Sequence, residues 1–290
     1  MKYGIYYTYW EKEWGGQFVP YIKRVRDLGF DILEVACGNF HLESDGFFHQ
    51  LKEVADEYGI MLTGGYGPRR EHNLASSDMA AVDKALLFYT DVFRKMAIAG
   101  IRSIGGALYS YWPVDFSLEI DKQGDFARSS TAMKRLADLA AAYGITLNME
   151  VLNRFEGYLL NECAECVEYV KAVDRPNVKV MLDTFHMNIE EDSITAAIQL
   201  AGGLLGHVHV GEANRRPPSP QGRMPWKEIG AALQSVGYNG NVVMEPFVTM
   251  GGQVGKDISI WRDLSHGASE AQLDADASRA VKFLREIFEI

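Results

Sequence analysis

The chain has 290 residues, of which 47% are hydrophobic and 23% charged, a composition typical of globular proteins with a sizeable core. Its formal net charge of −10 argues against a nucleic-acid partner, which would require a basic face. We find no signal peptide and no apolar run long enough for a membrane span, so we expect a cytoplasmic protein without a membrane partner. Three cysteines are too few for a disulfide framework, and this agrees with a reducing compartment.

Short apolar runs typical of strands alternate with segments of helical periodicity along the whole chain. The strands are expected at residues 3–9, 32–36, 60–63, 101–108, 145–150, 178–183, 205–210 and 241–245. The helices that follow them are expected at residues 17–28, 45–58, 79–99, 129–143, 162–173, 193–200, 225–236 and 269–288. Several of these helices are followed at once by glycine, the usual residue of a left-handed helix cap, as at Gly59 and Gly144.

Regular alternation of strands and helices predicts an α/β fold with a parallel sheet. Eight such units predict that the sheet closes into one (β/α)8 TIM barrel, so we expect residues 1–290 to form a single catalytic domain. An open, doubly wound sheet is the alternative. It is disfavoured because no G-x-G-x-x-G follows the first strand, where a dinucleotide site would normally lie.

Four neighbouring strands are expected to end on residues that can bind a metal ion. Glu150, Asp183, His209 and Glu245 end the fifth, sixth, seventh and eighth predicted strands. The active sites of such barrels lie at the carboxyl ends of the strands, so these side chains should converge. Carboxylates and one imidazole suit a divalent ion such as Mn²⁺, Co²⁺ or Mg²⁺. The alternative is a set of separate ion pairs at the rim of the barrel.

Polar residues just beyond these strand ends are candidates for holding a substrate, because loops at this rim usually do so. They are Glu156, His186 and Arg215. Tyr6 and Trp112 are candidates for the wall of a pocket, whereas Tyr111 is interpreted as a packing residue. For His207, which shares the inward face of its strand with His209, packing or support of a ligand is favoured over ligation. The C-x-x-C at 163–166 has no second pair, which disfavours a zinc or redox role.

A metal ion beside two glutamates is suited to proton transfer at carbon. The ion can polarise a carbonyl and so make the hydrogen on the adjacent carbon removable by a carboxylate. Two carboxylates on opposite faces would take the proton from one side and return it to the other. This arrangement would invert a stereocentre without an organic cofactor.

Five segments resemble motifs of the D-tagatose 3-epimerase family, and most closely those of its D-allulose (D-psicose) 3-epimerases. They are G-I-Y-Y-T-Y-W at 4–10, G-G-A-L-Y-S-Y-W-P at 105–113, E-V-L-N-R-F-E at 150–156, V-M-L-D-T-F-H-M-N-I-E-E-D-S at 180–193 and V-V-M-E-P-F at 242–247. The resemblance extends over essentially the whole chain. Together these segments make it highly specific.

The resemblance implies a barrel of the xylose isomerase-like type and reversible inversion at C3 of a free ketohexose, interconverting D-fructose and D-allulose through a cis-enediolate. It implies one divalent metal ion per subunit, for which Mn²⁺ is expected first and Co²⁺ or Mg²⁺ are alternatives. It also implies a homodimer or homotetramer. The family's metal ligands fall on Glu150, Asp183, His209 and Glu245, and its two acid/base residues on Glu150 and Glu245. Its substrate-binding positions fall on Tyr6, Gly65, Ala107, Trp112, Glu156, His186 and Arg215.

Two segments depart from the family pattern. Residues 37–47 do not align clearly, which puts the preference among C4 to C6 configurations in question. The loop at 211–226 is rich in proline, which stiffens a chain and so bears on heat tolerance or subunit contacts.

Several alternative functions remain open from the sequence. An epimerase preferring D-tagatose, D-sorbose or a ketopentose, an aldose–ketose isomerase and a polyol dehydratase could all use this ligand set. A phosphodiester-cleaving barrel of the endonuclease IV type would want more histidine ligands and a basic groove. A non-catalytic sugar-binding protein would not need paired glutamates.

Overall fold

The computed structural model describes residues 1–289. Its strands form a closed barrel in which each strand pairs in parallel with its neighbours in the chain, and β8 pairs with β1. The strands are β1 (Lys2–Tyr6), β2 (Ile32–Ala36), β3 (Met61–Gly65), β4 (Ser103–Gly106), β5 (Thr146–Glu150), β6 (Val178–Asp183), β7 (Leu205–Val210) and β8 (Asn241–Met244). The (β/α)8 barrel predicted from the sequence is therefore confirmed.

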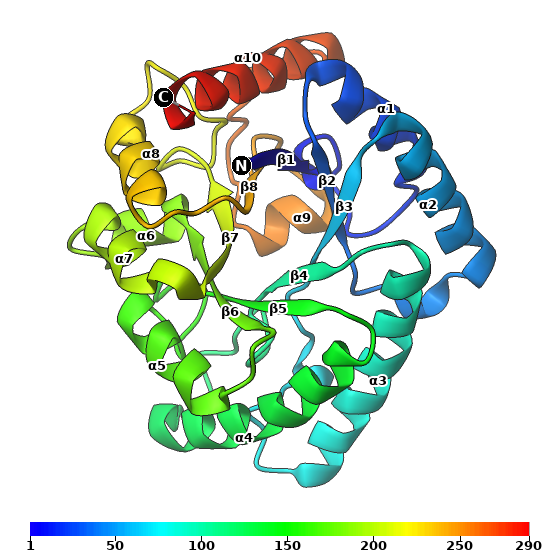
Figure 1. Cartoon of the computed structure of the whole chain (residues 1–290), viewed down its shortest axis with the longest axis vertical. Coiled ribbons are helices and arrows are strands. Elements are labelled where there is room, and N and C mark those ends of the chain that lie inside the picture. Colours follow the sequence, from blue (N-terminus) through cyan, green and yellow to red (C-terminus); the bar gives the residue numbers. More distant parts are fainter. Residues whose placement is uncertain (290) are drawn as a thin grey trace.

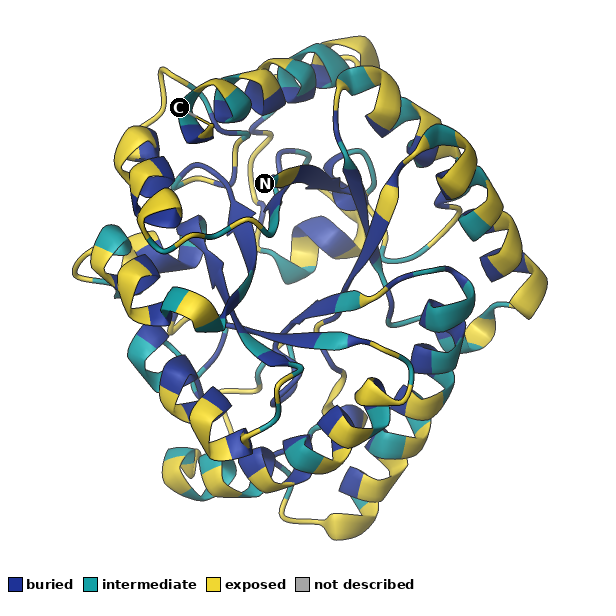
Figure 2. Ribbon diagram, in the orientation of Figure 1, coloured by how far each residue is buried: buried dark blue, intermediate teal, exposed yellow. Residues whose placement is uncertain are grey.

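A ring of helices surrounds the barrel, as Figure 1 shows. Its members are α1 (Val19–Leu28), α2 (Asp45–Tyr58), α3 (Met79–Ile98), α4 (Lys122–Ala141), α5 (Cys163–Val173), α7 (Ile194–Ala201), α8 (Trp226–Ser235) and α10 (Glu270–Phe288). The exposed residues of these helices lie on their outer faces, whereas the strands are almost entirely buried (Figure 2). Within residues 1–289, none of the helices has the length and apolar character needed to cross a membrane.

Local signals fix where several helices begin and end. Helices α1 and α2 end at Gly29 and Gly59, whose φ angles of 94° and 65° lie in the left-handed region that glycine adopts without strain. At the start of α2, the side chain of Ser44 accepts a hydrogen bond from the backbone N–H of Phe47. The glycine and serine positions in the sequence therefore set the lengths of these helices and place the next strand.

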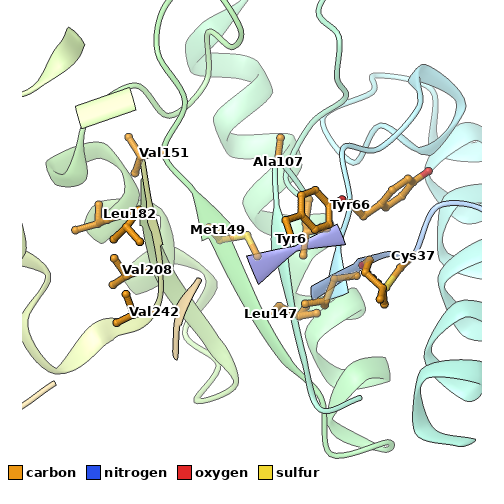
Figure 3. Close-up of a cluster of buried hydrophobic side chains, with 14 of the residues drawn as sticks. Tyr6, Cys37, Tyr66, Ala107, Leu147, Met149, Val151, Leu182, Val208 and Val242 are labelled. Carbon is orange, nitrogen blue, oxygen red and sulfur yellow. Dashed lines mark hydrogen bonds between the residues drawn. The ribbon is translucent and has the colours of Figure 1, made fainter. Parts of the chain in front are cut away.

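Alternation along each strand decides which side chains point into the barrel and which point toward the surrounding helices. Leu182, Val208 and Val242 are partners in register on β6, β7 and β8, and they form one buried row (Figure 3). Because successive side chains of a strand point to opposite faces, the neighbouring residues Asp183 and His209 point the other way, into the barrel. Apolar packing on one face thus fixes the direction of the polar side chains on the other.

The structure differs from the predicted elements at several boundaries. Residues Tyr7–Tyr9 form a 3₁₀ turn instead of extending β1, and three more such turns lie at Phe40–Leu42, Arg70–His72 and Gly202–Leu204. Helix α4 begins at Lys122 and not at 129, because the side chain of Asp121 caps it by accepting from Gly124 N. Two short helices were not predicted, α6 (Thr184–Glu190) and α9 (Gly252–Asp257). Asp183 caps α6 by accepting from Phe185 N.

The proline-rich loop after β7 is organised by one buried carboxylate. Glu212, 6% exposed, accepts hydrogen bonds from the backbone N–H groups of Ser219 and Arg223 and from the indole of Trp226. These bonds hold the later part of the loop against Glu212, which lies at its start. The expected effect of this loop on heat tolerance or subunit contacts stays a prediction.

Candidate active site

The structure brings the four predicted ligand residues together at the carboxyl ends of their strands. Glu150 and Asp183 are the last residues of β5 and β6, His209 is the last but one of β7, and Glu245 directly follows β8. Each offers one ligand atom, and these atoms all lie within 4.8 Å of one another. The closeness follows from register, since Asp183 is the partner of His209 across β6 and β7. One buried site that could bind a metal ion therefore exists.

The chemistry of this cluster fits a divalent cation. Burial, and next the nearby carboxylate of Glu245, raise the pKa of Glu150 well above its usual range. Nδ1 of His209 is buried without a hydrogen-bond partner, 3.5 Å from Glu245 Oε1 and 3.8 Å from Glu150 Oε1. A cation with oxygen and nitrogen ligands would relieve the carboxylate repulsion and use this free imidazole nitrogen. The oxygen and nitrogen atoms of these four side chains are therefore arranged as a divalent metal ion would need them.

Arg215 supplies a positive charge beside the carboxylates. Its Nη1 lies 3.0 Å from Asp183 Oδ2 and 2.7 Å from Glu245 Oε2. Its guanidinium carbon lies 3.9 Å from the ring centroid of Phe185, a cation–π contact. The backbone of Arg215 has a φ of 63°, a left-handed conformation that is uncommon for a residue with a side chain. Such backbone strain is often found at functional sites, and here it directs the guanidinium inward.

His186 presents an N–H group to the cluster. Its Nδ1 accepts hydrogen bonds from the backbone N–H of Asn153 at 3.1 Å and from the Asn153 side chain at 2.8 Å. Burial lowers the pKa of His186 to about 3, so the ring is neutral. Because Nδ1 accepts from a backbone N–H, the proton is assigned to Nε2, which lies 3.4 Å from Nη2 of Arg215. Nε2 of His186 is 3.8 Å from Glu150 Oε1 and 3.7 Å from Asp183 Oδ2. The ring can therefore donate a hydrogen bond to a sugar oxygen at this point.

Glu156 joins the same network from the loop after β5. Its Oε1 accepts a hydrogen bond from the side-chain amide of Asn153 at 3.1 Å and lies 3.5 Å from Arg215 Nη2. The three polar residues predicted beyond the strand ends are thus brought together beside the four candidate metal ligands, called the metal-ligand cluster below.

A cavity of about 230 Å³ opens above this cluster, and every predicted site residue except Asp183 lines it. The predicted substrate-binding residues that lie outside the polar network form the walls of the cavity; they are Tyr6, Gly65, Ala107 and Trp112. Gly65 lies close to Tyr6, since an added Cβ would be 3.0 Å from the hydroxyl oxygen of Tyr6 and would require that ring to shift by a few tenths of an ångström. Figure 3 labels Tyr6 and Ala107, which lie at the carboxyl ends of β1 and β4. Tyr111, interpreted as a packing residue, is buried and is not part of this wall.

Several site residues were not found from the sequence. Glu34 on β2 lies 2.6 Å from Nε2 of His209 across the barrel. A carboxylate in the middle of the apolar strand I-L-E-V-A was the available signal. Trp14, Asn39 and Arg69 also line the cavity, and Arg69 donates a hydrogen bond to Asn39 at 3.0 Å. These come from loops whose shape the sequence pattern did not define.

Known proteins resemble this chain in sequence along its whole length. The model of the xylose isomerase-like TIM barrel family matches residues 22–286. A relative from Ruminiclostridium cellulolyticum named D-psicose 3-epimerase is 53% identical over 289 residues, which cover 100% of this chain and 98% of the relative.

Solved structures agree with this similarity. A crystal structure of D-psicose 3-epimerase with D-tagatose, from Clostridium cellulolyticum, has a TM-score of 0.98 and 53% identity and covers 100% of both chains. A crystal structure of D-psicose 3-epimerase in the presence of D-fructose has a TM-score of 0.97 and 52% identity and covers 99% of both chains.

Proposed function

Because the chain belongs to the xylose isomerase-like TIM barrel family and, within it, to the D-psicose (D-allulose) 3-epimerases, which are isomerases acting on ketoses, we propose that it interconverts D-fructose and D-allulose. The observation that carries this proposal is the pair Glu150 and Glu245, which lie at the end of β5 and directly after β8 and line one cavity. The site thus offers two carboxylates to one bound sugar.

The proposed cofactor is one divalent metal ion per subunit, held by Glu150, Asp183, His209 and Glu245. Mn²⁺ is the first choice, with Co²⁺ and Mg²⁺ as alternatives; carboxylates suit Mn²⁺ and Mg²⁺, whereas the imidazole favours a transition metal. When bound, the ion supplies a Lewis acid that acidifies the C–H bond next to the ketone carbonyl. The cluster of buried carboxylates around the unpartnered Nδ1 of His209 supports this assignment.

The proton transfers are assigned to the two glutamates. One of Glu150 and Glu245 takes the proton from C3, which leaves the sugar as a cis-enediolate. The other glutamate gives a proton to the opposite face of C3, and the configuration at this carbon is inverted. In the reverse direction the two residues exchange roles.

The polar residues beside the cluster are assigned to hold the O1–O2 end of the sugar. His186 can donate from Nε2, Arg215 can donate from its guanidinium, and Glu156 can accept from a sugar hydroxyl. The contact of His186 with Asn153 and that of Arg215 with Glu156 keep these side chains in place before the sugar binds, which lowers the entropy lost on binding. Tyr6, Gly65, Ala107 and Trp112 are assigned to the pocket wall.

D-Tagatose is a second candidate substrate. The related enzyme with 53% identity was crystallised with this sugar. D-Tagatose and D-fructose differ at C4, the carbon next to the reacting one, so the distinction depends on cavity residues farther from the metal-ligand cluster. Asn39, Arg69 and Asp257, which line the cavity outside the metal-ligand cluster, are assigned to make it.

We further propose a homodimer or homotetramer in the cytoplasm. Large exposed apolar side chains on the loops after β4 and β5 support self-association; these are Phe116 (46% exposed), Leu118 (41%) and Phe155 (72%). The three cysteines are free and buried, in agreement with a reducing compartment. Analytical ultracentrifugation tests the subunit number.

The test of function is incubation of metal-stripped protein with D-fructose in D₂O, with and without Mn²⁺, followed by NMR of the sugar. We expect D-allulose carrying deuterium at C3 only when Mn²⁺ is present. Turnover of D-tagatose but not of D-fructose would support epimerisation at C3 and would replace D-fructose by D-tagatose as the proposed substrate. Absence of metal-dependent exchange with either ketose would contradict the proposal.

A further inference from the structure

One buried carboxylate in the barrel interior has no part in the proton transfers proposed above. Glu34 on β2 is 1% exposed, and both of its oxygens have partners. Oε1 lies 2.6 Å from Nε2 of His209, and Oε2 accepts a hydrogen bond from Thr63 at 2.7 Å. His207 Nε2 also lies 3.1 Å from Oε2. Glu34 therefore joins the two inward-facing histidines of β7 to the opposite side of the barrel.

The contact between Glu34 and His209 determines which imidazole nitrogen is free. A carboxylate is an acceptor, so the proton in this hydrogen bond is carried by Nε2 of His209. The other nitrogen, Nδ1, is buried without a hydrogen-bond partner and faces the carboxylates of Glu150 and Glu245. A ring held in this way points Nδ1 at the cluster of ligand atoms, where its lone pair can bind a cation when the ring is neutral.

We propose that Glu34 is a positioning residue that holds His209 for metal binding. It fixes the rotation of the ring and its protonated nitrogen, and its negative charge makes Nδ1 a better donor to a cation. Supporting carboxylates of this kind strengthen metal binding at histidine ligands generally. The inference rests on the proposed function, because it assumes that the cluster of four residues holds a metal ion.

A purely structural role explains Glu34 less well. Burying a carboxylate inside a barrel is unfavourable, and an apolar side chain of the same size would fill this space without that penalty. A second metal ion is the other alternative, since atoms of Glu34, His207 and His209 also lie within 4.8 Å of one another. It is disfavoured because Nε2 of His209 and both oxygens of Glu34 are already engaged with each other and with Thr63.

The test compares Mn²⁺ binding by metal-stripped wild type, Glu34→Met, Glu34→Gln and Thr63→Val, using the EPR signal of free Mn²⁺ to obtain the Kd and the number of ions per chain. Glu34→Met removes the acceptor and should raise the Kd about 10- to 100-fold. Glu34→Gln keeps an acceptor but not the charge, so its Kd should lie in between. Thr63→Val changes the same buried cluster without touching His209 and should bind like wild type.

Each result separates the inference from the proposed function. If wild type binds no Mn²⁺, the proposed metal site fails. If wild type binds one ion and all variants bind it with the same Kd, Glu34 has no positioning role. Two ions in wild type and one in the Glu34 variants would assign Glu34 to a second metal site instead. Circular dichroism checks folding, and should Glu34→Met fail to fold, an unchanged Kd in Glu34→Gln overturns the inference.

Discussion

Trp14 and Asp257 are 243 positions apart in the chain, yet the indole Nε1 of Trp14 donates a hydrogen bond to Asp257 Oδ2 over 2.8 Å. The ring of Trp14 also packs edge-on against Trp112, with centroids 6.0 Å apart, and against Phe247 at 6.3 Å. All four residues line the cavity. The bond therefore ties the loop after β1 to the end of α9 at one wall of the pocket.

Loss of this bond should weaken substrate binding more than it slows the reaction. For Asp257→Ala we expect KM to rise roughly fivefold, equivalent to about 1 kcal/mol, with kcat little changed. Steady-state kinetics with D-fructose measures both values. Asp257→Asn keeps an acceptor for the indole and serves as the matched control. A fall in kcat at constant KM would show that the contact acts on the chemical step instead.

The two glutamates should each be essential for epimerisation. Glu150→Gln and Glu245→Gln should each lower kcat by about 10²-fold or more, because a positioned acid or base contributes that much. The two-base scheme makes a sharper prediction for the metal-loaded variants in D₂O. Each should still exchange the C3 proton of one epimer, and the two variants should differ in which epimer exchanges. Full epimerase activity in either variant would rule out the scheme.

Metal binding should stabilise the folded protein. A ligand that binds only the native state adds about 2.7 kcal/mol when its concentration is 100 times the Kd. The midpoint of thermal unfolding of stripped protein should therefore rise with added Mn²⁺ and fall again with a chelator. Asp183→Asn removes one charged ligand and should reduce this rise. An equal rise in the variant would exclude Asp183 as a ligand.

His72 should make the stability of the protein depend on pH. Its Nδ1 is 2.7 Å from the Tyr66 hydroxyl, its ring stacks on Phe88 at 3.7 Å, and burial lowers its pKa to about 4. Between this value and the ordinary pKa of about 6.5, the unfolded chain binds the proton and the folded chain does not. Stability therefore falls as the pH is lowered through this window.

The magnitude can be tested by denaturant unfolding of metal-stripped protein at pH 7 and pH 5. The contribution of His72 to the loss of stability should be about 2 kcal/mol. His72→Gln cannot take up the proton, so its unfolding free energy should change less between the two pH values. His49→Gln is the control, since His49 is exposed. Identical pH dependence in wild type and His72→Gln would contradict the assignment.

The sequence by itself determined the barrel and the place of the ligand cluster, because both follow from local patterns. Helix caps such as Gly59 lie next to the segments that they terminate. Strand alternation orients Asp183 and His209 without reference to distant residues. Parallel strands then bring their carboxyl ends to one edge, so residues at equivalent positions converge whatever the loops do.

Only the tertiary structure decided which distant groups support that cluster. Glu34 and His209 are 175 positions apart, and their contact depends on β2 facing β7 across a closed barrel. The direction of Arg215 depends on a left-handed backbone conformation inside an irregular loop. Helix α9 and its bond to Trp14 depend on the path of the long connection after β8. Such contacts join elements through space and leave no periodic trace in the chain, because their energy comes from pairing buried polar groups after folding.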